Sequence, residues 1–512
     1  MLLRFAATVG GFTLLSRVLG FARDILIAVF LGASAAGDAF FISFKLPNLF
    51  RRLFAEGAFN LAFVPMFTSA LASDGRAAAR VFAEDALAVL LWALLAMVVL
   101  AQIAMPWLML VIAPGFADDP AKFDLTVYLA RLTFPYLLFI SLVSLLSGLL
   151  NSLERFAAAA AAPIFLNLCL IGALLGFARA GETPAHALAW GVAIAGLIQF
   201  LWLAWNCKRA NFLPRLSWPR LTPSVRRLLV LMLPAVVGAG VVQLNLVVDM
   251  IIASLLPDGS VSHLYYADRV VQLPLGVIGV AIGTALLPTL SRQVAGKDGD
   301  AAYNSQNRAI EYALLLTLPA AAALMVIATP IVHVLFERAA FDARATTMTA
   351  GVLAAYAIGL PAFVLVKVLA PGYFARKDPR APVRAAVWAL AVNVVLNLLF
   401  MKPFGVVGIA LASALSAWLN AALLAKGLYV RRYFRPDRLL RRRVPRMLLA
   451  SMAMVLLLLV FLKVLTPWLL GGIGLKVSAL LGLVLVGVVG FTLTANIIGA
   501  MRWQDLRVAL KG

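Results

Sequence analysis

Charged side chains interrupt three stretches of the chain that are otherwise apolar enough to span a membrane. They are Arg17, Arg23 and Asp24 in the first stretch, Asp38, Lys45, Arg51, Arg52 and Glu56 in the second, and Asp268 and Arg269 in a later one. A charge at bilayer depth costs roughly 2.5 to 3.5 kcal/mol, so such a group usually lines a polar cavity or pairs with another charge. Guanidinium groups stay charged and bind phosphate oxygens two at a time, while carboxylates can hold them until an anion arrives. These residue types indicate a cavity that binds a phosphate-like anion.

The spacing of the charges in the second stretch supports a lined cavity. Asp38, Lys45 and Arg52 follow one another at intervals of seven residues, and Glu56 comes four residues later. On a helix these four positions share one stripe. Arg51 lies about 100 degrees from Arg52 around the helix, so it falls outside that stripe.

The first stretch repeats the pattern, because Arg17 and Asp24 are seven residues apart with Arg23 beside them. The alternative for all these groups is a set of internal salt bridges that lock helices together, and it applies most directly to Asp24 and Asp38. A further alternative for Lys45 is that its long stem carries the ammonium toward the membrane surface.

The elements that must position these residues are membrane-spanning helices. The 512 residues are 63% hydrophobic and only 13% charged, which no soluble fold could bury. Apolar runs of about 20 residues recur throughout, and a helix satisfies its own backbone in lipid. We predict an all-α polytopic membrane protein with fourteen transmembrane helices, near residues 3–30, 37–70, 81–112, 124–151, 159–178, 186–207, 226–255, 264–291, 307–336, 345–374, 383–402, 405–430, 446–466 and 474–500.

The distribution of Lys and Arg predicts the orientation of these helices. The two ends and the even-numbered loops hold 29 basic residues, whereas the odd-numbered loops hold seven. By the positive-inside rule both termini face the cytoplasm. The net charge of +22 is thereby explained by topology and anionic headgroups rather than by nucleic acid, for which no binding motif is present.

Other sources of chemistry are weakly represented. The sequence has two cysteines and three histidines without metal-ligand spacing, so we predict no firm metal site and no cofactor. It contains neither a P-loop nor a zinc-protease or serine-hydrolase motif. No catalytic residue is assigned, and any transport would be driven by a gradient or by the membrane potential.

The chain also repeats itself. Residues 11–28 align with residues 238–255, Pro135 with Pro361, and Asn167 with Asn393. Six helices per copy is an even number, so both copies begin on the same face of the membrane. We predict a first lobe over residues 1–212, a second over 213–436, and two additional helices in 437–512.

The repeat makes the charges in the first copy more informative. Where that copy has Arg17, Arg23 and Asp24, the second has Leu244, Met250 and Ile251. Packing in this architecture therefore does not require charge at these positions, and we assign the charges to function.

These residues carry a resemblance to a known family. The sequence resembles the MurJ (MviN) family of bacterial lipid II flippases through SRVLGFARD at 16–24, GDAFFISFKLPNLFRRLFAEGAFNLAFVP at 37–65, APGF at 113–116, YYADRVVQLPLGVIGVAIGTALLP at 265–288 and KVLAPGYFARKDPRAPV at 367–383. The similarity runs through all the expected helices in order. It implies the fold of the multidrug/oligosaccharidyl-lipid/polysaccharide exporter superfamily, with two lobes around a central cationic cavity.

The resemblance also implies a substrate and a set of site residues. The substrate would be lipid II, the undecaprenyl-diphosphate-linked disaccharide-pentapeptide, moved from the inner to the outer leaflet of the cytoplasmic (inner) membrane by alternating access. Membrane lipids and cell-wall synthesis proteins are the other candidate partners. Residues 437–512 would form a groove for the lipid tail. Transferred by motif, the cavity residues are Ser16, Arg17, Arg23, Asp38, Arg51, Arg52, Glu56, Asp268 and Arg269.

Among these residues and Asp24, we expect Arg17, Arg23, Arg52 and Arg269, with Arg51 and Ser16, to bind substrate, and Asp24, Asp38, Glu56 and Asp268 to gate or form salt bridges. Coupling to sodium or protons is open. Asp249, Asn393 and Asn397 offer oxygen ligands for a hard cation. The resemblance implies a possible sodium site there, since some members of the family bind sodium at this place; polar packing is the alternative.

Three other functions fit parts of the sequence. A drug or cation antiporter of the same superfamily would favour an acidic cavity, whereas the arginines here favour an anion. A flippase for another polyprenyl-diphosphate-linked glycan would differ in the pathway stopped by depletion. A membrane-embedded transferase acting on polyprenyl phosphates would show turnover with purified substrate in detergent.

Overall fold

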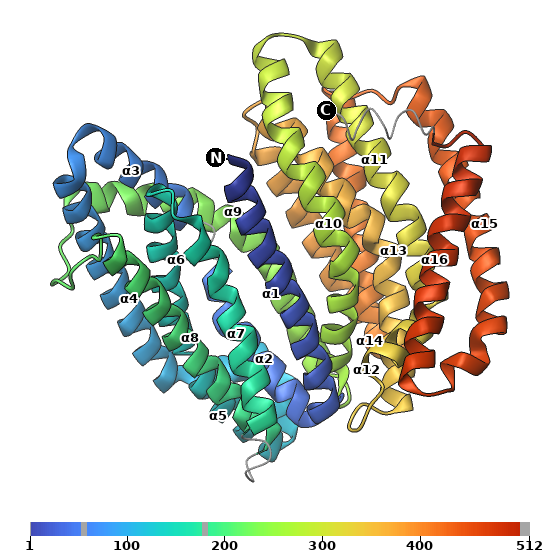
Figure 1. Cartoon of the computed structure of the whole chain (residues 1–512), viewed down its shortest axis with the longest axis horizontal. Coiled ribbons are helices and arrows are strands. Elements are labelled where there is room, and N and C mark those ends of the chain that lie inside the picture. Colours follow the sequence, from blue (N-terminus) through green and yellow to red (C-terminus); the bar gives the residue numbers. More distant parts are fainter. Residues whose placement is uncertain (1, 53–58, 177–182, 502–512) are drawn as a thin grey trace. The chain divides into compact units, whose positions relative to one another are not determined.

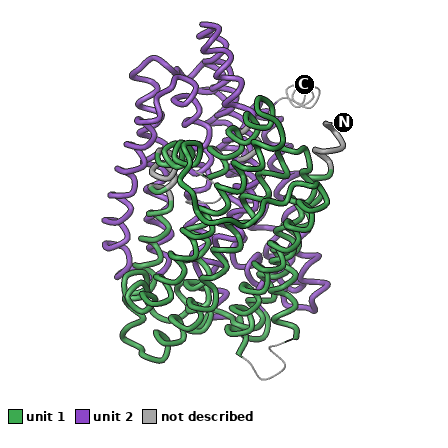
Figure 2. Tube along the Cα trace, turned by 90° about the vertical axis from the view of Figure 1, so that its left-hand side faces the viewer, with its two compact units in different colours: residues 1–262, 338–341 green, residues 263–337, 342–512 purple. Residues whose placement is uncertain are grey.

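The computed structural model describes residues 2–52, 59–176 and 183–501. Helices account for the regular structure of these residues, and no strand occurs among them. Two compact units emerge from the contacts, coloured separately in Figure 2: unit 1 is residues 1–262 with 338–341, and unit 2 is residues 263–337 with 342–512. The all-α membrane fold expected from composition is confirmed.

Unit 1 is built from the N-terminal half of the chain (Figure 1). It contains α1 (Leu2–Leu31), α2 (Ala35–Phe50), α3 (Asn60–Ser73), α4 (Gly75–Ile112), the 3-10 helix η2 (Pro114–Asp118), α5 (Pro120–Thr133), α6 (Tyr136–Ser152), α7 (Phe156–Gly176), α8 (Pro184–Arg209), α9 (Pro223–Ser254) and the start of α10. Helix α1 packs on α7, α7 on α8, and α2 on α5. The charged positions of the first two stretches thus lie on α1, on α2 and just beyond α2.

Unit 2 holds the remaining helices. They are most of α10 (Ser260–Ala295), α11 (Gly299–Val326), α12 (Ala328–Phe336), α13 (Ala343–Phe374), α14 (Arg380–Val430), α15 (Arg438–Leu469) and α16 (Ile473–Ile497). Small residues allow α13 and α14 to pack closely: a Cβ added to Gly359 would lie 2.8 Å from the Cα of Ala414. Close approach through small residues is a common way to join helices where lipid removes the hydrophobic driving force.

Two of the expected spans are divided between two helices: that near 124–151 between α5 and α6, and that near 307–336 between α11 and α12. The span near 37–70 contains α2 and α3, and residues 53–58 between them lie outside the described residues. The expected spans near 383–402 and 405–430 both lie within α14, where they are separated by a kink at Gly405 with non-helical φ 55° and ψ −134°. This conformation suits glycine, and Pro403 before it lacks a helical donor. Among the described residues, nine helical segments are long and apolar enough to cross a membrane. The count of fourteen spans stays a prediction.

Proline explains the local structure near the end of α2. Pro47 has no N–H, so the carbonyl of Ser43 loses its helical donor. The hydroxyl of Thr133 on α5 donates to that carbonyl at 2.9 Å instead. The helix continues into a π-helical turn at Arg51 and Arg52. Such turns are rare and often occur at functional sites.

A buried ionic cluster fixes α15 to α11 in unit 2. Glu311 on α11 is 2% exposed and pairs with Arg308 and with Arg443 of α15, while Arg308 also pairs with Asp437. The amide of Asn307 donates to the carbonyl of Arg435 at 2.9 Å. Because a buried carboxylate needs charged partners, this cluster fixes the first turns of α15.

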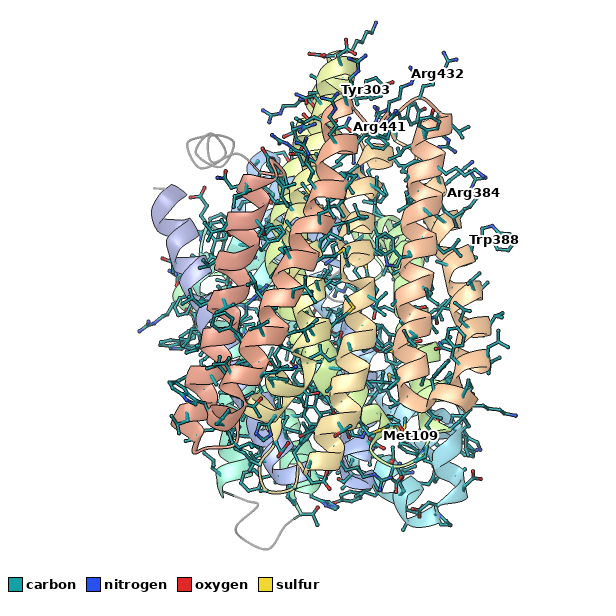
Figure 3. All side chains as sticks on the ribbon, turned by 90° about the vertical axis from the view of Figure 1, so that its right-hand side faces the viewer. Met109, Tyr303, Arg384, Trp388, Arg432 and Arg441 are labelled. Atoms are coloured by element: carbon teal, nitrogen blue, oxygen red, sulfur yellow. The ribbon has the colours of Figure 1, made fainter. Side chains whose placement is uncertain are left out.

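Basic residues gather at one end of unit 2. Tyr303, Arg432 and Arg441 lie at the same end in Figure 3, and the Tyr303 hydroxyl donates to the carbonyl of Arg432. This is the end at which α11 and α15 begin and α14 finishes. The predicted domain boundaries, 1–212, 213–436 and 437–512, follow the sequence repeat rather than contacts, and they stay a prediction.

Candidate functional site

Arg23 is held by buried partners on two helices. Its Nε and Nη2 donate to Asp24 Oδ1 at 3.0 and 2.7 Å, and its Nη1 donates to Asn167 Oδ1 of α7 at 2.9 Å. Arg23 is 7% exposed and Asp24 is 3% exposed. The guanidinium is therefore presented in a fixed orientation, and its charge is compensated within the protein.

Asn167 organises the surrounding part of α1. Its amide donates to the carbonyl of Ser16 at 2.9 Å and lies 3.4 Å from the Ser16 hydroxyl. A Cβ added to Gly20 would stand 3.6 Å from the Asn167 amide, an ordinary van der Waals distance, so Asn167 packs directly against α1 at this position. Arg17 is exposed on α1. Sequence reasoning did not assign Asn167 to the site, although its alignment with Asn393 in the repeat was the available signal.

The charged residues on and beyond α2 have different surroundings. Arg51 is partly buried and its Nε donates to Asn48 Oδ1 at 3.1 Å, whereas Arg52 is exposed. Lys45 is partly buried. Glu56 lies outside the described residues. The π-helical turn places Arg51 and Arg52 at the end of the described part of this segment.

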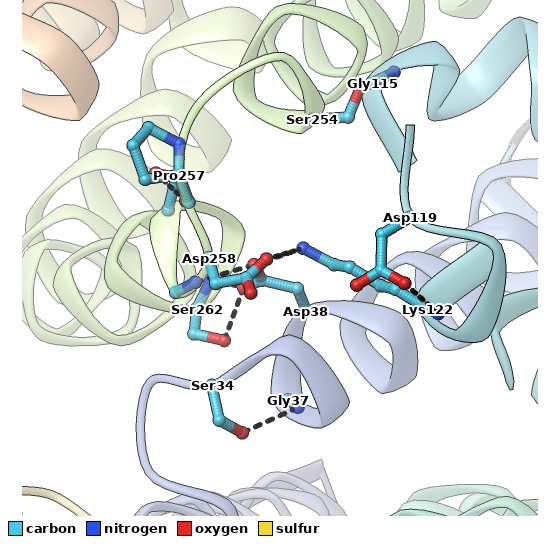
Figure 4. A network of polar contacts seen from close by, with 12 residues as sticks. Ser34, Gly37, Asp38, Gly115, Asp119, Lys122, Ser254, Pro257, Asp258 and Ser262 are labelled. Atoms are coloured by element: carbon cyan, nitrogen blue, oxygen red, sulfur yellow. Dashed lines mark hydrogen bonds and ion pairs between the residues drawn. The ribbon is translucent and has the colours of Figure 1, made fainter. Parts of the chain in front are cut away.

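Asp38 is the centre of a polar network in unit 1, shown in Figure 4. Its Oδ1 accepts from the backbone N–H of Ser262 at 2.8 Å and from the Ser262 hydroxyl at 2.7 Å. Its Oδ2 accepts from the N–H of Gly259 at 2.8 Å and from Lys122 Nζ at 3.3 Å. Asp38 thus caps the N-terminus of α10, where free N–H groups and the helix dipole favour a carboxylate.

Lys122 is the residue of this network that sequence reasoning missed. The sequence places it in the loop between the expected spans near 81–112 and 124–151, yet its side chain is 4% exposed and bridges Asp38 and Asp258. Its Nζ also lies 3.8 Å from the ring centroid of Phe116, in the APGF motif. Nothing in the spacing of the sequence connects residues 38, 122 and 258, so only packing could reveal this contact.

The two charges at the start of the third stretch belong to unit 2. Asp268 accepts a hydrogen bond from the amide of Gln272, one turn along α10. The guanidinium of Arg269 lies 4.7 Å from the ring centroid of Tyr265. Both residues are partly buried. Arg269 is thereby supported by an aromatic face, which suits a guanidinium.

The candidate cation ligands are divided between the units. Asp249 is buried on α9 of unit 1, whereas Asn393 and Asn397 are fully buried on α14 of unit 2. Asn397 donates to Asn393 Oδ1 at 3.0 Å, and Asn393 lies 3.4 Å from the Ser413 hydroxyl. Within the described ranges, no group of three His, Cys, Asp or Glu side chains could hold a metal ion. The cation site stays a prediction.

Comparison with known proteins identifies the family. The family model described as lipid II flippase MurJ matches residues 27–478. A probable lipid II flippase MurJ of Rhizobium tropici is 48% identical over 451 residues, which cover 87% of this chain and 84% of that protein. The probable lipid II flippase MurJ of Vibrio cholerae is 38% identical over 99% of this chain and 98% of its own length.

Solved structures agree on the fold. A structure of lipid II flippase MurJ in an inward closed conformation is similar with a TM-score of 0.80 at 24% identity, covering 97% of this chain and 99% of that one. A multidrug resistance transporter of the MATE family in an inward-facing conformation matches with a TM-score of 0.65 at 14% identity, covering 84% of this chain and 98% of its own. With the apolar helices, the sequence relatives establish a multi-pass membrane protein. The chain belongs to the MurJ family of lipid II flippases.

Proposed function

We propose that this protein moves lipid II from the inner to the outer leaflet of the bacterial cytoplasmic membrane by alternating access. Its relatives over most of the chain bear the name lipid II flippase. The family is one of flippases, so we assign substrate-binding and gating residues and no catalytic ones. The membrane potential or an ion gradient drives the movement, and both termini lie in the cytoplasm.

The buried Arg23 pair is the observation that supports this mechanism best. In the structure, the guanidinium of Arg23 donates hydrogen bonds to Asp24 and Asn167. A diphosphate can take the place of Asp24 on the guanidinium, which keeps the charge of Arg23 compensated, provided that the released Asp24 carboxylate becomes hydrated or protonated. The exchange gives two states that differ in the partner of Arg23, which is what a ligand-driven conformational equilibrium requires.

The remaining assignments extend the same exchange. The side chains of Arg17 and Arg52 are exposed. We propose that they bind the diphosphate with Arg23, and we give Arg269 the same role. Ser16 and Arg51 are additional substrate contacts, while Asp24, Asp38, Glu56 and Asp268 serve as gating or salt-bridge partners.

A drug or cation antiporter is the alternative that shares the fold, since a MATE transporter has the same architecture. A flippase for another polyprenyl-diphosphate-linked glycan is the nearer one. The arginines favour a diphosphate over a cationic drug, and the choice between glycans rests on substrate tests.

The test is a leaflet-resolved assay of lipid II in vesicles reconstituted with the purified protein. Membrane potential, sodium gradient and pH gradient are imposed separately. We expect protein-dependent appearance of lipid II in the opposite leaflet that depends on one of these gradients. A polyprenyl-diphosphate carrying a different glycan and a cationic drug serve as competing substrates. Transport of either of these with no movement of lipid II would overturn the proposal.

A further inference from the structure

Lys122 stands in an unusual position for a lysine. It lies in the first turn of α5, where the helix dipole disfavours a cation. Asp119 caps that turn and accepts from the N–H of Ala121 at 3.0 Å and from that of Lys122 at 3.2 Å. The lysine stem is buried, with Nζ 2.6 Å from Asp258 Oδ1 and 3.3 Å from Asp38 Oδ2. Helix stability does not account for a buried ammonium here, whereas its two carboxylate partners do.

The partners of Asp38 fall into two groups that differ in where they are attached. Lys122 lies on α5, which packs against α2 and is joined to it by two hydrogen bonds with Ser43. The other donors are Gly259, just before α10, and Ser262, in the first turn of α10; with Asp258 they make up the segment called here the α9–α10 turn. Asp258 has a side chain that is 61% exposed, so it is hydrated without Lys122.

The turn that Asp38 holds lies where the chain passes from unit 1 to unit 2. Ser262 is the last residue of unit 1 before the chain enters unit 2, and residues 338–341 return briefly to unit 1. There the N–H of Ala340 donates to the carbonyl of Val29 at 3.2 Å. Gly32, with φ of 60°, packs so closely that an added Cβ would lie 2.1 Å from the carbonyl oxygen of Ala340. Any change in the arrangement of the two units must be accommodated at these crossings.

We propose that Lys122 is the positioning residue that makes this hinge reversible. When the α9–α10 turn leaves Asp38, it removes three of the four donors of a fully buried carboxylate. Lys122 stays with α2 and keeps that carboxylate paired, and Asp258 leaves with the turn into water. Without Lys122 the departure would strand a buried charge, which is strongly unfavourable. The inference rests on the proposed alternating access.

The proposal predicts an unusual pattern of mutant effects. Lys122→Met removes the partner that remains, so the turn is retained on Asp38 and lipid II transport falls by about tenfold or more. Asp38→Asn/Lys122→Met removes both charges, leaves no carboxylate to strand, and regains transport close to that of Asp38→Asn alone. Lys122→Arg keeps a cation and transports well above Lys122→Met. Lys208→Met, which changes an exposed lysine at the end of α8, is the matched control and transports as the unmodified protein does.

Hinge motion is measured separately, without lipid II. Spin labels at Leu216→Cys in unit 1 and Val430→Cys in unit 2, which are 73% and 69% exposed, are introduced with Cys169→Ser and Cys207→Ser. We expect Lys122→Met to narrow the distribution of label distances to one population and the double variant to restore the distribution of Asp38→Asn.

The outcomes separate this inference from the proposed function. If Lys122→Met transports and moves like the unmodified protein, or if the double variant is no better than Lys122→Met, the role of Lys122 is overturned while lipid II transport stands. If the label distances respond as expected but the unmodified protein moves no lipid II, the proposed substrate fails and the hinge role is retained.

Discussion

Arg23 is the cationic residue whose surroundings are best defined, and they combine the two interpretations that its sequence context allowed. It is in a salt bridge with Asp24, and it is also held in a direction fixed by Asn167. A salt bridge and a binding site are compatible when the anionic partner can be exchanged. The sequence pointed to these charged residues as functional because a charge is costly in an apolar helix. For Asn167 the sequence offered only the alignment with Asn393, and for Lys122 it offered no signal, because the partners of both residues lie more than 80 residues away.

At the scale of single residues, we predict that lipid II transport is lost in each variant in which Ala replaces Arg17, Arg23, Arg52 or Arg269. A charge-assisted hydrogen bond contributes about 1.5 to 3 kcal/mol, which corresponds to a decrease of about 10- to 150-fold in rate. Lys keeps the charge but loses the two-point geometry, so it restores only part of the rate. The assay is leaflet-resolved transport at matched protein level. Arg220→Ala, in an exposed loop, is the control, and normal transport by all four Ala variants would leave only the salt-bridge role.

A second residue-scale prediction concerns Asp249. If it binds a hard cation, transport by the unmodified protein rises with sodium concentration, and Asp249→Ala loses that dependence. Asp249→Asn keeps one oxygen ligand and retains part of it. Transport rates are compared over a sodium titration at constant ionic strength. Full activity of Asp249→Ala at every sodium concentration excludes the site and favours polar packing.

At the scale of elements, sequence periodicity located the apolar segments but not their interruptions. Within the expected span near 37–70, the α-helix passes into a π-helical turn after Phe50, close to Pro47, which lacks the backbone donor that Thr133 on another helix replaces. The kink at Gly405 had a clearer signal, since Pro403 and Gly405 separate two expected spans. A helix irregularity that depends on a partner far away in the chain cannot be recognised from local periodicity. One caused by the local residue types, such as Pro and Gly, can.

The loop between α12 and α13 leads to a prediction about pH. Burial raises the pKa of the Glu337 carboxyl, but contacts with His333 at 2.8 Å and the Thr346 hydroxyl at 2.6 Å outweigh burial and bring the pKa below its ordinary value of 4.5. The contacts therefore stabilise the fold above about pH 4.5, and the gain is lost as pH falls through the lowered pKa. We expect Glu337→Gln to melt a little below the unmodified protein at pH 7 and together with it at strongly acid pH. Equal melting temperatures at both pH values would contradict the prediction.

The terminal pair α15 and α16 provides a prediction about the lipid tail. Leu456, Val460 and Val464 form an exposed stripe at intervals of four residues on α15. If the pair binds the polyprenyl chain, Gln at these three positions lowers lipid II transport without lowering the amount of protein in the membrane. Gln at Leu470, which is exposed in the turn between the helices, is the control. Unchanged transport after all three replacements would indicate that the stripe only faces bulk lipid.

At the scale of the whole molecule, the composition was sufficient to predict an α-helical membrane protein. The motifs and their order were sufficient to predict the family. The division into units was less accessible. The repeat suggested boundaries near 212 and 436. In the structure, the chain passes from one compact unit to the other within α10 and again on either side of residues 338–341. A repeat records similarity between segments, while a compact unit depends on contacts, and the return of 338–341 to unit 1 leaves no mark in the sequence pattern.

The topology is also tested at this scale. We expect cysteines introduced at Arg215 and Arg438 to be protected from an impermeant thiol reagent in intact cells, and those at Asp118 and Asp258 to be labelled. The reason is the excess of basic residues in the even-numbered loops. Cys169→Ser and Cys207→Ser supply the background, and permeabilised cells provide the control for reactivity. Labelling of position 438 from outside would contradict the fourteen-span arrangement.

The buried cluster of Glu311 has a consequence for biosynthesis. Arg443, its partner on α15, follows 132 residues later in the chain. At a synthesis rate of about 5 to 20 residues per second, Glu311 must wait on the order of 7 to 26 seconds for that partner after it leaves the ribosome. Arg308, one helical turn before Glu311, is made first and pairs with it from the start. The nascent helix α11 therefore carries its own counter-ion into the membrane, and Arg443 completes the cluster when the last helices insert.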